Sequence, residues 1–283
     1  MYIAFYVGIT VVSILIILVI VLTCICTLGM EQCNDGSYKT LLTCVSINTT
    51  SSISKPSWIE IQQKYPTYII NIERTRYRYD TCCSRVYGAG YRNINRFEGI
   101  DGKFDNLKES FSNHYQNLPN ASLSTSSEQG CFLSWMNVLL HIIKNKIPYC
   151  TIFEDDVIFI ENFQSIAEDY FDKTPIFDYV YMGFIPNIMH IALGSLTYNT
   201  IVRCPSVTTH ALLVSYEGAQ KMYRCLLNQI KIKAIDEVLK YDSGSFNYYC
   251  WNHSHWNKST TYPFNLIRGL VLQDDKFETS IQN

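Results

Sequence analysis

Apolar and polar positions alternate along the chain in two periods, which predict strands and helices in turn. Short apolar runs rich in β-branched and aromatic residues predict buried strands. Between them, apolar residues return at every third or fourth position, which predicts amphipathic helices. The predicted strands cover residues 67–72, 92–103, 149–153, 177–184, 208–215 and 266–273. Strand–helix alternation predicts an α/β fold with a mainly parallel central sheet.

The clearest predicted helix precedes the third of these strands. Thr125 and Glu128 have the spacing of a capping box, in which a hydroxyl and a carboxylate satisfy free backbone N–H groups at a helix start. Phe132, Met136 and further apolar residues follow at helical spacing, and Pro148 ends the pattern. Residues 103–124 are polar, which predicts a loop.

The N-terminal segment has a different pattern. No residue from Met1 to Met30 is charged, and the apolar stretch 4–27 is long enough to cross a membrane as a helix. An uncleaved anchor is favoured over a cleaved signal peptide, because the basic start is missing and the apolar run is longer than usual. Residues 28–65, which are rich in Ser, Thr and Asn, predict a stem, and residues 66–283 the folded domain.

Net charge, cysteine content and glycosylation sequons indicate which partners and which cellular compartment to expect. The formal net charge of the 283 residues is −2, so the basic excess expected of a nucleic-acid-binding protein is missing. The chain has 11 cysteines, and glycosylation sequons begin at Asn48, Asn120, Asn252 and Asn257. Both observations favour an oxidising compartment. They predict a type II single-pass membrane protein with its domain in the ER or Golgi lumen.

Three adjacent carboxylates, Glu154, Asp155 and Asp156, follow the predicted strand 149–153. Carboxylates this close repel one another, so a cation would relieve the cost of gathering them at the end of a buried strand. Oxygen ligands suit Mg²⁺ or Mn²⁺, and ligands of α/β proteins bind beyond the carboxyl ends of strands. A solvated acidic turn is the alternative. The apolar strand before the triplet favours a metal site that also binds a nucleotide diphosphate.

Seven segments spanning about residues 66–275 resemble glycosyltransferase family 25, and they occur in the same order. TYIINIERTRYR is similar to the family's opening Ile-Asn-Leu strand with its Arg-rich continuation, and FEGIDGK to its Val-Asp-Gly turn. SEQGCFLSWMNVL resembles its Glu-Ile-Gly-Cys-x-Leu-Ser-His helix, and IPYCTIFEDDV its Leu-Glu-Asp-Asp segment. DYVYMGF, TTHALLVSYEGAQKM and AIDEVL resemble its later segments.

The resemblance implies a GT-A type nucleotide-sugar-binding fold and a UDP-sugar donor, most often UDP-galactose, with a divalent metal, Mn²⁺ or Mg²⁺. It implies an inverting hexosyltransferase that moves a hexose, expected to be galactose, to a hydroxyl of a glycan or glycoprotein acceptor. Inversion requires a general base that is separate from the metal. The alternative is a membrane glycoprotein that keeps a degenerate fold and only binds.

The resemblance also implies roles for single residues. Glu154 and Asp156 are expected to bind the metal and the diphosphate, and Asp155 the sugar or ribose. Asp236 or Glu237 is the candidate catalytic base, and a solvated helix start is the alternative interpretation of that pair.

Other candidates are expected to contact the nucleotide sugar. Asn71 and Arg74 lie at the end of the first strand, Asp101 matches the Val-Asp-Gly acid, and Ser134 is retained from the family's helix. His210 matches the Thr-His-Ala segment, and it lines the site or is a hydrogen-bonded core histidine.

Trp135 and the histidines near the C-terminus do not fit the family pattern. Trp135 stands where the family usually has His, so specificity could differ or activity could be lost. His253 and His255 have the spacing of a metal-ligand pair, but no family motif matches them. Only His255 is retained as a candidate metal ligand.

Overall fold

The computed structural model describes residues 30–32, 38–40, 55–117, 125–186, 199–206, 208–253 and 268–274. The chain divides into two compact units, Met1–Ser54 and Lys55–Asn283. In the first, β1 (Met30–Gln32) pairs antiparallel with β2 (Tyr38–Thr40). The predicted anchor at residues 4–27 lies outside the described residues. Within the described part of the chain, no helix is both long and apolar enough to span a membrane.

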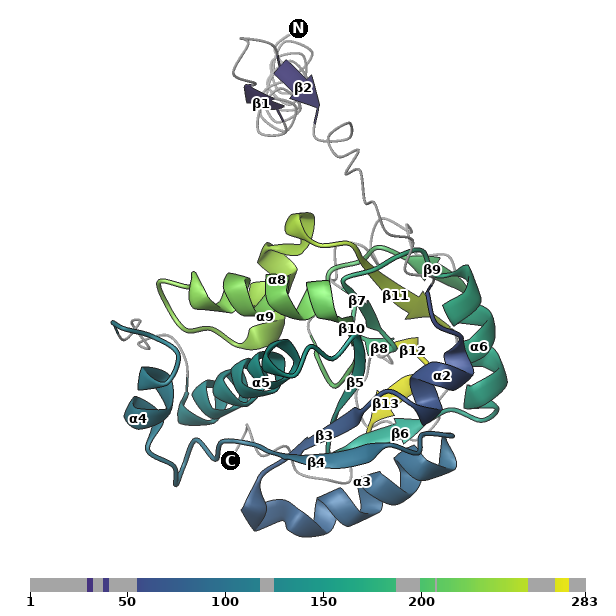
Figure 1. The fold of residues 1–283 in the computed structure, drawn as a ribbon, viewed down its shortest axis with the longest axis horizontal. Helices are drawn as coiled ribbons and strands as arrows, with labels where there is room; N and C mark the ends of the chain where they lie inside the picture. The colour runs from purple at the N-terminus through teal and green to yellow at the C-terminus, as the bar shows by residue number, and fades with distance from the viewer. Residues whose placement is uncertain are drawn as a thin grey trace, which may run out of the picture. The chain divides into compact units, whose positions relative to one another are not determined.

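A seven-stranded sheet forms the centre of the second unit (Figure 1). In spatial order its strands are β4 (Ile94–Glu98), β3 (Thr67–Asn71), β5 (Tyr149–Glu154), β10 (Ala211–Ser215), β7 (Tyr179–Tyr181), β11 (Tyr248–Asn252) and β9 (Thr200–Val202). Three of the neighbouring pairs are parallel and three are antiparallel. The sheet is therefore mixed, and the expectation of a mainly parallel sheet is wrong.

The direction of β10 accounts for much of this difference. It lies between β5 and β7 and is antiparallel to both. All five of its residues are buried. A strand that is buried on both faces is a continuous apolar run, and such a run gives the same pattern in either direction. The sequence pattern thus identifies the strand but leaves its orientation open.

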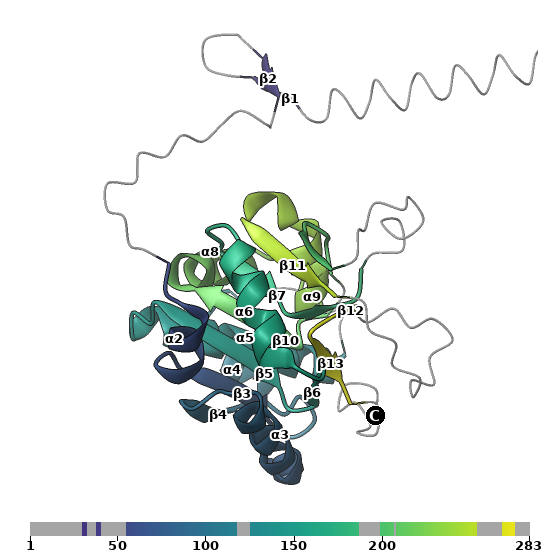
Figure 2. The same cartoon turned by 90° about the vertical axis from the view of Figure 1, so that its right-hand side faces the viewer.

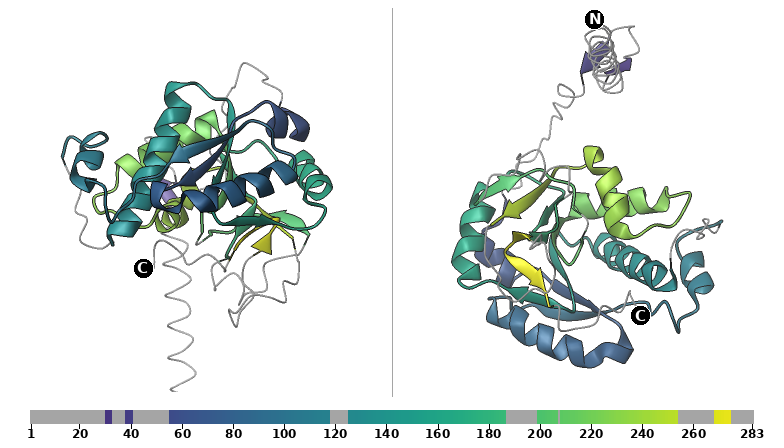
Figure 3. Two further views of the ribbon diagram at one scale, coloured as in Figure 1. Left: turned by 90° about the horizontal axis from the view of Figure 1, so that it is seen from below. Right: turned by 180° about the vertical axis from the view of Figure 1, so that it is seen from behind.

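Helices cover both faces of the sheet, as Figures 2 and 3 show from other sides. One face carries α4 (Leu107–Ser112), α5 (Ser126–Lys144), α8 (Tyr216–Leu227) and α9 (Ile235–Tyr241). The other carries α2 (Trp58–Gln63), α3 (Arg76–Gly88) and α6 (Phe163–Lys173). Short 3₁₀ turns lie at η1 (Glu73–Thr75) and η2 (Ser243–Ser245). The result is a three-layer α/β/α arrangement.

Successive residues of each central strand point to opposite faces of the sheet, so the sheet contributes to two hydrophobic cores, one on each face. Ile152 and Leu212 belong to the core under α5 and α8, whereas Phe153 and Leu213 belong to the core under α2 and α6. This is the two-residue period of a strand that is buried on both faces. The predicted strands 67–72, 149–153 and 208–215 correspond to β3, β5 and β10.

The folded unit begins earlier than the boundary expected at residue 66. Lys55 is the first residue of the compact unit, and α2 follows with Trp58 and Ile61 buried in the second core. Ser57 starts this helix with a capping box. The six-residue helix is too short to show an apolar period, and a Ser/Thr-rich run precedes it. Similarly, α4 lies within the segment that was expected to be a loop.

Two short antiparallel pairs complete the unit. β6 (Val157–Phe159) pairs with β13 (Val271–Gln273), and β8 (Gly183–Phe184) pairs with β12 (Arg268–Gly269). The first pair follows the acidic triplet directly, since β6 begins one residue after Asp156. It therefore brings the end of the described chain beside the carboxyl end of β5.

Candidate functional site

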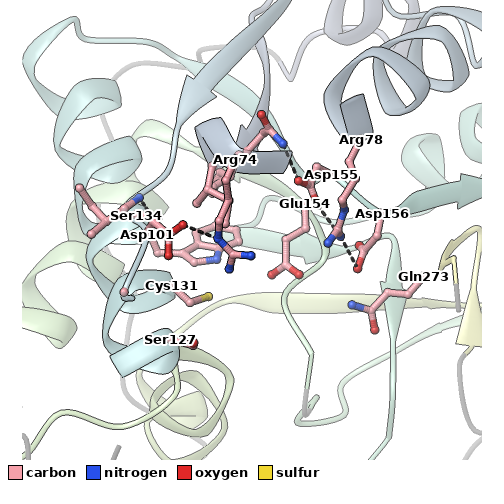
Figure 4. A pocket seen from close by; sticks show the side chains of 16 residues that line it. Arg74, Arg78, Asp101, Ser127, Cys131, Ser134, Glu154, Asp155, Asp156 and Gln273 are labelled. Atoms are coloured by element: carbon pink, nitrogen blue, oxygen red, sulfur yellow. Dashed lines mark hydrogen bonds and ion pairs between the residues drawn. The ribbon is translucent and has the colours of Figure 1, made fainter. Parts of the chain in front are cut away.

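A pocket opens at the carboxyl ends of β3 and β5, and the acidic triplet forms part of its wall (Figure 4). β3 and β5 are parallel neighbours, so both end at the same edge of the sheet. The opposite wall comes from the turn at Asp101 and from the N-terminal half of α5. Gln273 of β13 closes the remaining side. This is the place where ligands of α/β proteins bind.

Within the triplet, Asp155 is held by other protein groups. Its Oδ1 lies 2.5 Å from Nη2 of Arg78, and its Oδ2 accepts a 2.6 Å hydrogen bond from Nδ2 of Asn71. The hydroxyl of Thr75 also donates to Oδ2. Burial raises the pKa of Asp155, and the charge of Arg78 and the hydrogen bond from Asn71 oppose that shift. Both carboxylate oxygens are thus occupied within the fold.

Glu154 and Asp156 are less well compensated. Glu154 accepts one 3.2 Å hydrogen bond from the hydroxyl of Thr209, and Oδ1 of Asp156 is buried with no partner among the described residues. The second oxygen of Asp156 lies 3.4 Å from Arg78. Burial and the neighbouring carboxylates raise the pKa of Glu154 to about 8 and that of Asp156 to about 6. Added positive charge would favour the ionised form of both groups.

These two carboxylates fit a divalent cation that is shared with a ligand. In the described part of the chain, no group of three or more His, Cys, Asp or Glu is arranged to hold a metal ion. Mg²⁺ is commonly bound by only one or two carboxylates, with water and substrate phosphates completing its shell. Asp156 offers a buried oxygen without a partner, and it shares the guanidinium of Arg78 with Asp155. The donor set therefore suits Mg²⁺ or Mn²⁺ beside a phosphate.

Arg78 and Asn71 position the triplet from inside the fold. Arg78 is buried on α3 and contacts both aspartates, a role that no sequence motif predicted. Its spacing of four residues from Arg74 was the available signal, because residues at that spacing share a helix face. Asn71 was expected to face the nucleotide. It lines the first pocket, where its amide donates to Asp155 and its oxygen accepts from Nε of Arg96.

The turn at Asp101 lies across the pocket from the triplet. Oδ2 of Asp101 lies 2.5 Å from Nε of Arg74, and both residues line the pocket. Oδ1 of Asp101 accepts a hydrogen bond from the backbone N–H of Lys103, which stabilises the turn. Arg74 remains partly exposed, so its remaining N–H groups can reach an anion in the pocket. The structure thus brings both predicted residues to the pocket wall.

Ser134 fastens this turn to α5. Its hydroxyl donates to the carbonyl of Gly130 at 2.7 Å and accepts from the backbone N–H of Ile100 at 2.8 Å. Ser134 lines the pocket, as expected, but its hydroxyl is already hydrogen-bonded within the fold. Its contribution is to hold the residue before Asp101 in place.

Close packing at Gly130 gives a testable prediction about this contact. A Cβ at Gly130 would lie 2.6 Å from both the N of Gly102 and the O of Ile100. Because backbone atoms cannot move aside cheaply, we expect Gly130→Ala to lower the free energy of unfolding by about 1–3 kcal/mol. Denaturant titration followed by circular dichroism measures the change.

Gly88 provides the matched control, since it ends α3 and nothing lies within 4 Å of the Cβ that alanine would add. Gly88→Ala should leave stability unchanged or raise it by about 0.4–1 kcal/mol. An equal effect of the two substitutions would contradict the close approach of α5 and the turn.

A second pocket adjoins the first, and it contains Asp236. Cys131, Glu154 and Gln273 line both pockets, so the two cavities meet at these side chains. Asp236, at the start of α9, lines the second pocket together with Glu128. Burial raises the pKa of Asp236, which increases its strength as a base.

Only one of the two candidate bases, Asp236 and Glu237, lines a pocket. Glu237 is exposed and lies outside the lining of both pockets, whereas Asp236 faces the second pocket. Adjacent residues on a helix point in directions about 100° apart, so only one of the two could share the site.

His210 lies in the core and outside the lining of both pockets. Its Nε2 donates a 3.0 Å hydrogen bond to the carbonyl of Val271. Burial lowers the pKa of His210 to about 4, so the ring is neutral at physiological pH. This arrangement corresponds to the second interpretation given above, a hydrogen-bonded core histidine. His255 lies outside the described residues.

The sequence predicts no role for two pocket residues, Cys131 and Gln273, and it marks Trp135 only as a departure from the family pattern. Trp135 is fully buried on α5 and contributes to the first pocket's wall. Cys131 stands one helical turn earlier, within a segment that resembles the family's helix. Gln273 gave no sequence signal, because only the pairing of β13 with β6 brings it to the site.

A layered α/β domain with an acidic cluster beyond a strand end is typical of enzymes that bind phosphorylated ligands. Comparison with known proteins specifies the family. The sequence profile described as "Glycosyltransferase family 25 (LPS biosynthesis protein)" matches residues 64–239. The chain therefore belongs to glycosyltransferase family 25, as the sequence resemblance implied.

Two further similarities are more distant. The human protein procollagen galactosyltransferase 2 is 23 % identical over 193 residues, which are 58 % of this chain and 29 % of that protein. The chain thus matches less than a third of the relative's length. The crystal structure of mouse xyloside xylosyltransferase 1 in its apo form aligns with a TM-score of 0.32 and 9 % identity, over 65 % of this chain and 77 % of that one.

Proposed function

We propose that this protein is a metal-dependent hexosyltransferase of the GT-A type, which transfers galactose from UDP-galactose to a hydroxyl group with inversion. One observation carries the proposal: two under-compensated carboxylates, Glu154 and Asp156, line the first pocket, and Glu154 lies where that pocket meets the second. One pocket has the features expected for a donor diphosphate, and the other holds a separate acid, Asp236. The name of the human relative supports galactose as the transferred sugar and a protein as acceptor.

The chain's own residues divide the chemistry among them. Glu154 and Asp156 would hold a divalent cation, which supplies positive charge for the diphosphate as it leaves. Arg78 and Asn71 keep Asp155 fixed, so the triplet is preorganised before the donor binds. Arg74 lies at the rim of the first pocket, from which it can neutralise donor phosphate charge.

We assign the role of general base to Asp236. In an inverting transfer, the acceptor hydroxyl attacks the anomeric carbon from the face opposite the leaving diphosphate while a base removes its proton. Asp236 lines the pocket on the far side of Glu154, and its raised pKa suits proton abstraction. The acceptor hydroxyl would therefore enter through the second pocket, and its proton would pass to a carboxylate oxygen of Asp236.

Turnover of UDP-sugars tests this proposal. We expect the purified full-length protein to release UDP from UDP-galactose when Mn²⁺ is present, and to stop when a chelator removes the metal. Calorimetry should show UDP binding that depends on the metal. UDP binding without any turnover, across several UDP-sugars and acceptors, would favour the alternative of a binding protein. If the protein neither bound UDP nor turned over any UDP-sugar, both the transferase and the binding protein would be excluded.

A further inference from the structure

Gln273 lies where the two pockets meet, and the proposed reaction assigns it no role. It is the last residue of β13, and it lines both pockets. Figure 4 shows its amide pointing from the β13 side into the cavity beside Glu154 and Asp156. The transferred sugar must lie at such a junction, since it is bonded to the diphosphate on one side and attacked by the acceptor on the other.

The side-chain amide of Gln273 is uncommitted. It has no hydrogen-bond partner among the described residues, although it carries two donor N–H groups and an acceptor oxygen. The neighbouring polar groups differ in this respect. Asn71 and Arg78 hold Asp155, and Asp274 pairs with Arg85 at 2.5 Å. Among these groups, the amide of Gln273 is the one available to an incoming ligand.

The strand that carries Gln273 is nevertheless held firmly. Gln273 pairs with Val157 in the β6–β13 ladder, and the backbone N–H of Asp274 donates to the carbonyl of Asp156 at 2.6 Å. His210, from the core, donates to the carbonyl of Val271 in the same strand. These contacts fix the backbone on both sides of Gln273. A ligand that binds its amide therefore meets a preorganised group.

The chemistry of an amide at this place indicates its ligand. Several carboxylates line the surrounding wall, and a carboxylate binds a cation or accepts a proton. A neutral amide both donates and accepts hydrogen bonds, as a sugar hydroxyl does. We propose that Gln273 is a specificity-determining residue that hydrogen-bonds hydroxyl groups of the transferred hexose. This inference rests on the proposed function, because it assigns a residue to the same site.

The test compares Gln273→Leu and Gln273→Ala with the wild-type protein, all as full-length chains. We expect kcat/KM for UDP-galactose to fall about 10- to 100-fold in both variants, because the sugar loses its hydrogen-bond partner. The ratio of kcat/KM for UDP-galactose to that for its epimer UDP-glucose should move toward one. The Kd for UDP, which lacks the sugar, should stay within about twofold of wild type in the presence of Mn²⁺.

Gln63→Leu is the matched control, since Gln63 is exposed on α2 and lies outside both pockets. This control should retain wild-type kinetics. A variant at Gln273 with unchanged kcat/KM and an unchanged donor ratio would overturn the inference alone. An equal loss of UDP affinity would also overturn it, because Gln273 would then hold the nucleotide or the metal. A wild-type protein that turns over no UDP-hexose would overturn the proposed function, and this inference with it.

Discussion

The Asp156→Asn variant is expected to lose UDP-galactose turnover by at least about 100-fold while remaining folded. Asp156 has a buried oxygen without a partner, so it is the carboxylate best prepared to bind a cation. The amide keeps the shape of the side chain but removes its negative charge. Steady-state turnover and Mn²⁺ binding by calorimetry measure the two consequences, and both should decline together.

Stability gives an independent readout for the same variant. Burial and neighbouring carboxylates raise the pKa of Asp156 to about 6, so its charge is unfavourable in the metal-free fold. Asp156→Asn should therefore leave the metal-free protein at least as stable as wild type at neutral pH. Asp80→Asn, an exposed change on α3, serves as the control and should retain full turnover. Full turnover by Asp156→Asn would contradict the assignment of the metal site.

The Arg78→Met variant is expected to lose about 3–5 kcal/mol of unfolding free energy. Arg78 is buried on α3, and its guanidinium contacts Asp155 at 2.5 Å and Asp156 at 3.4 Å. Methionine has a similar length but no charge, so two buried carboxylates would lose their compensating cation. Denaturant titration at neutral pH and low salt measures the loss, and added Mn²⁺ should recover part of it.

Arg76→Met is the matched control for this substitution. Arg76 lies two residues earlier, and its side chain is 52 % exposed and reaches Glu73 only at 3.7 Å. Exposed pairs of this kind contribute little, so we expect a change within about 0.5 kcal/mol. If both arginine variants unfolded at the same denaturant concentration, the proposed role of Arg78 in holding the acidic triplet would fail.

Much of the site could be predicted because its residues lie in short contiguous motifs. Asn71 and Glu154 end β3 and β5, and Arg74, Asp155 and Asp156 lie just beyond them. Strand prediction places these residues at strand ends, and the parallel pairing of β3 with β5 puts both ends at one sheet edge. The capping box at Thr125 also formed as predicted, with the backbone N–H of Thr125 donating to Glu128. Local sequence is enough to predict these features, because each depends on residues that are close together in the chain.

Other residues of the site depend on contacts between distant segments. Gln273 reaches the triplet only because β13 pairs with β6 across more than a hundred residues, and no local pattern encodes that pairing. His210 matched a family segment, but its side chain turns into the core to bind Val271. The choice of Asp236 over Glu237 likewise depended on which side of α9 faces the pocket. Side-chain direction follows from packing, which the sequence pattern records only in part.

The sequence by itself determined the α/β class, the principal strands and helices, the acidic centre and the family, because each of these depends on local periodicity or contiguous motifs. The tertiary structure decided the direction of β10, the burial of α2, and the division of labour within the triplet. These depend on which distant segments pack together, and only the folded chain places Arg78 and Asn71 against Asp155. That contact leaves Glu154 and Asp156 as the carboxylates available to a cation.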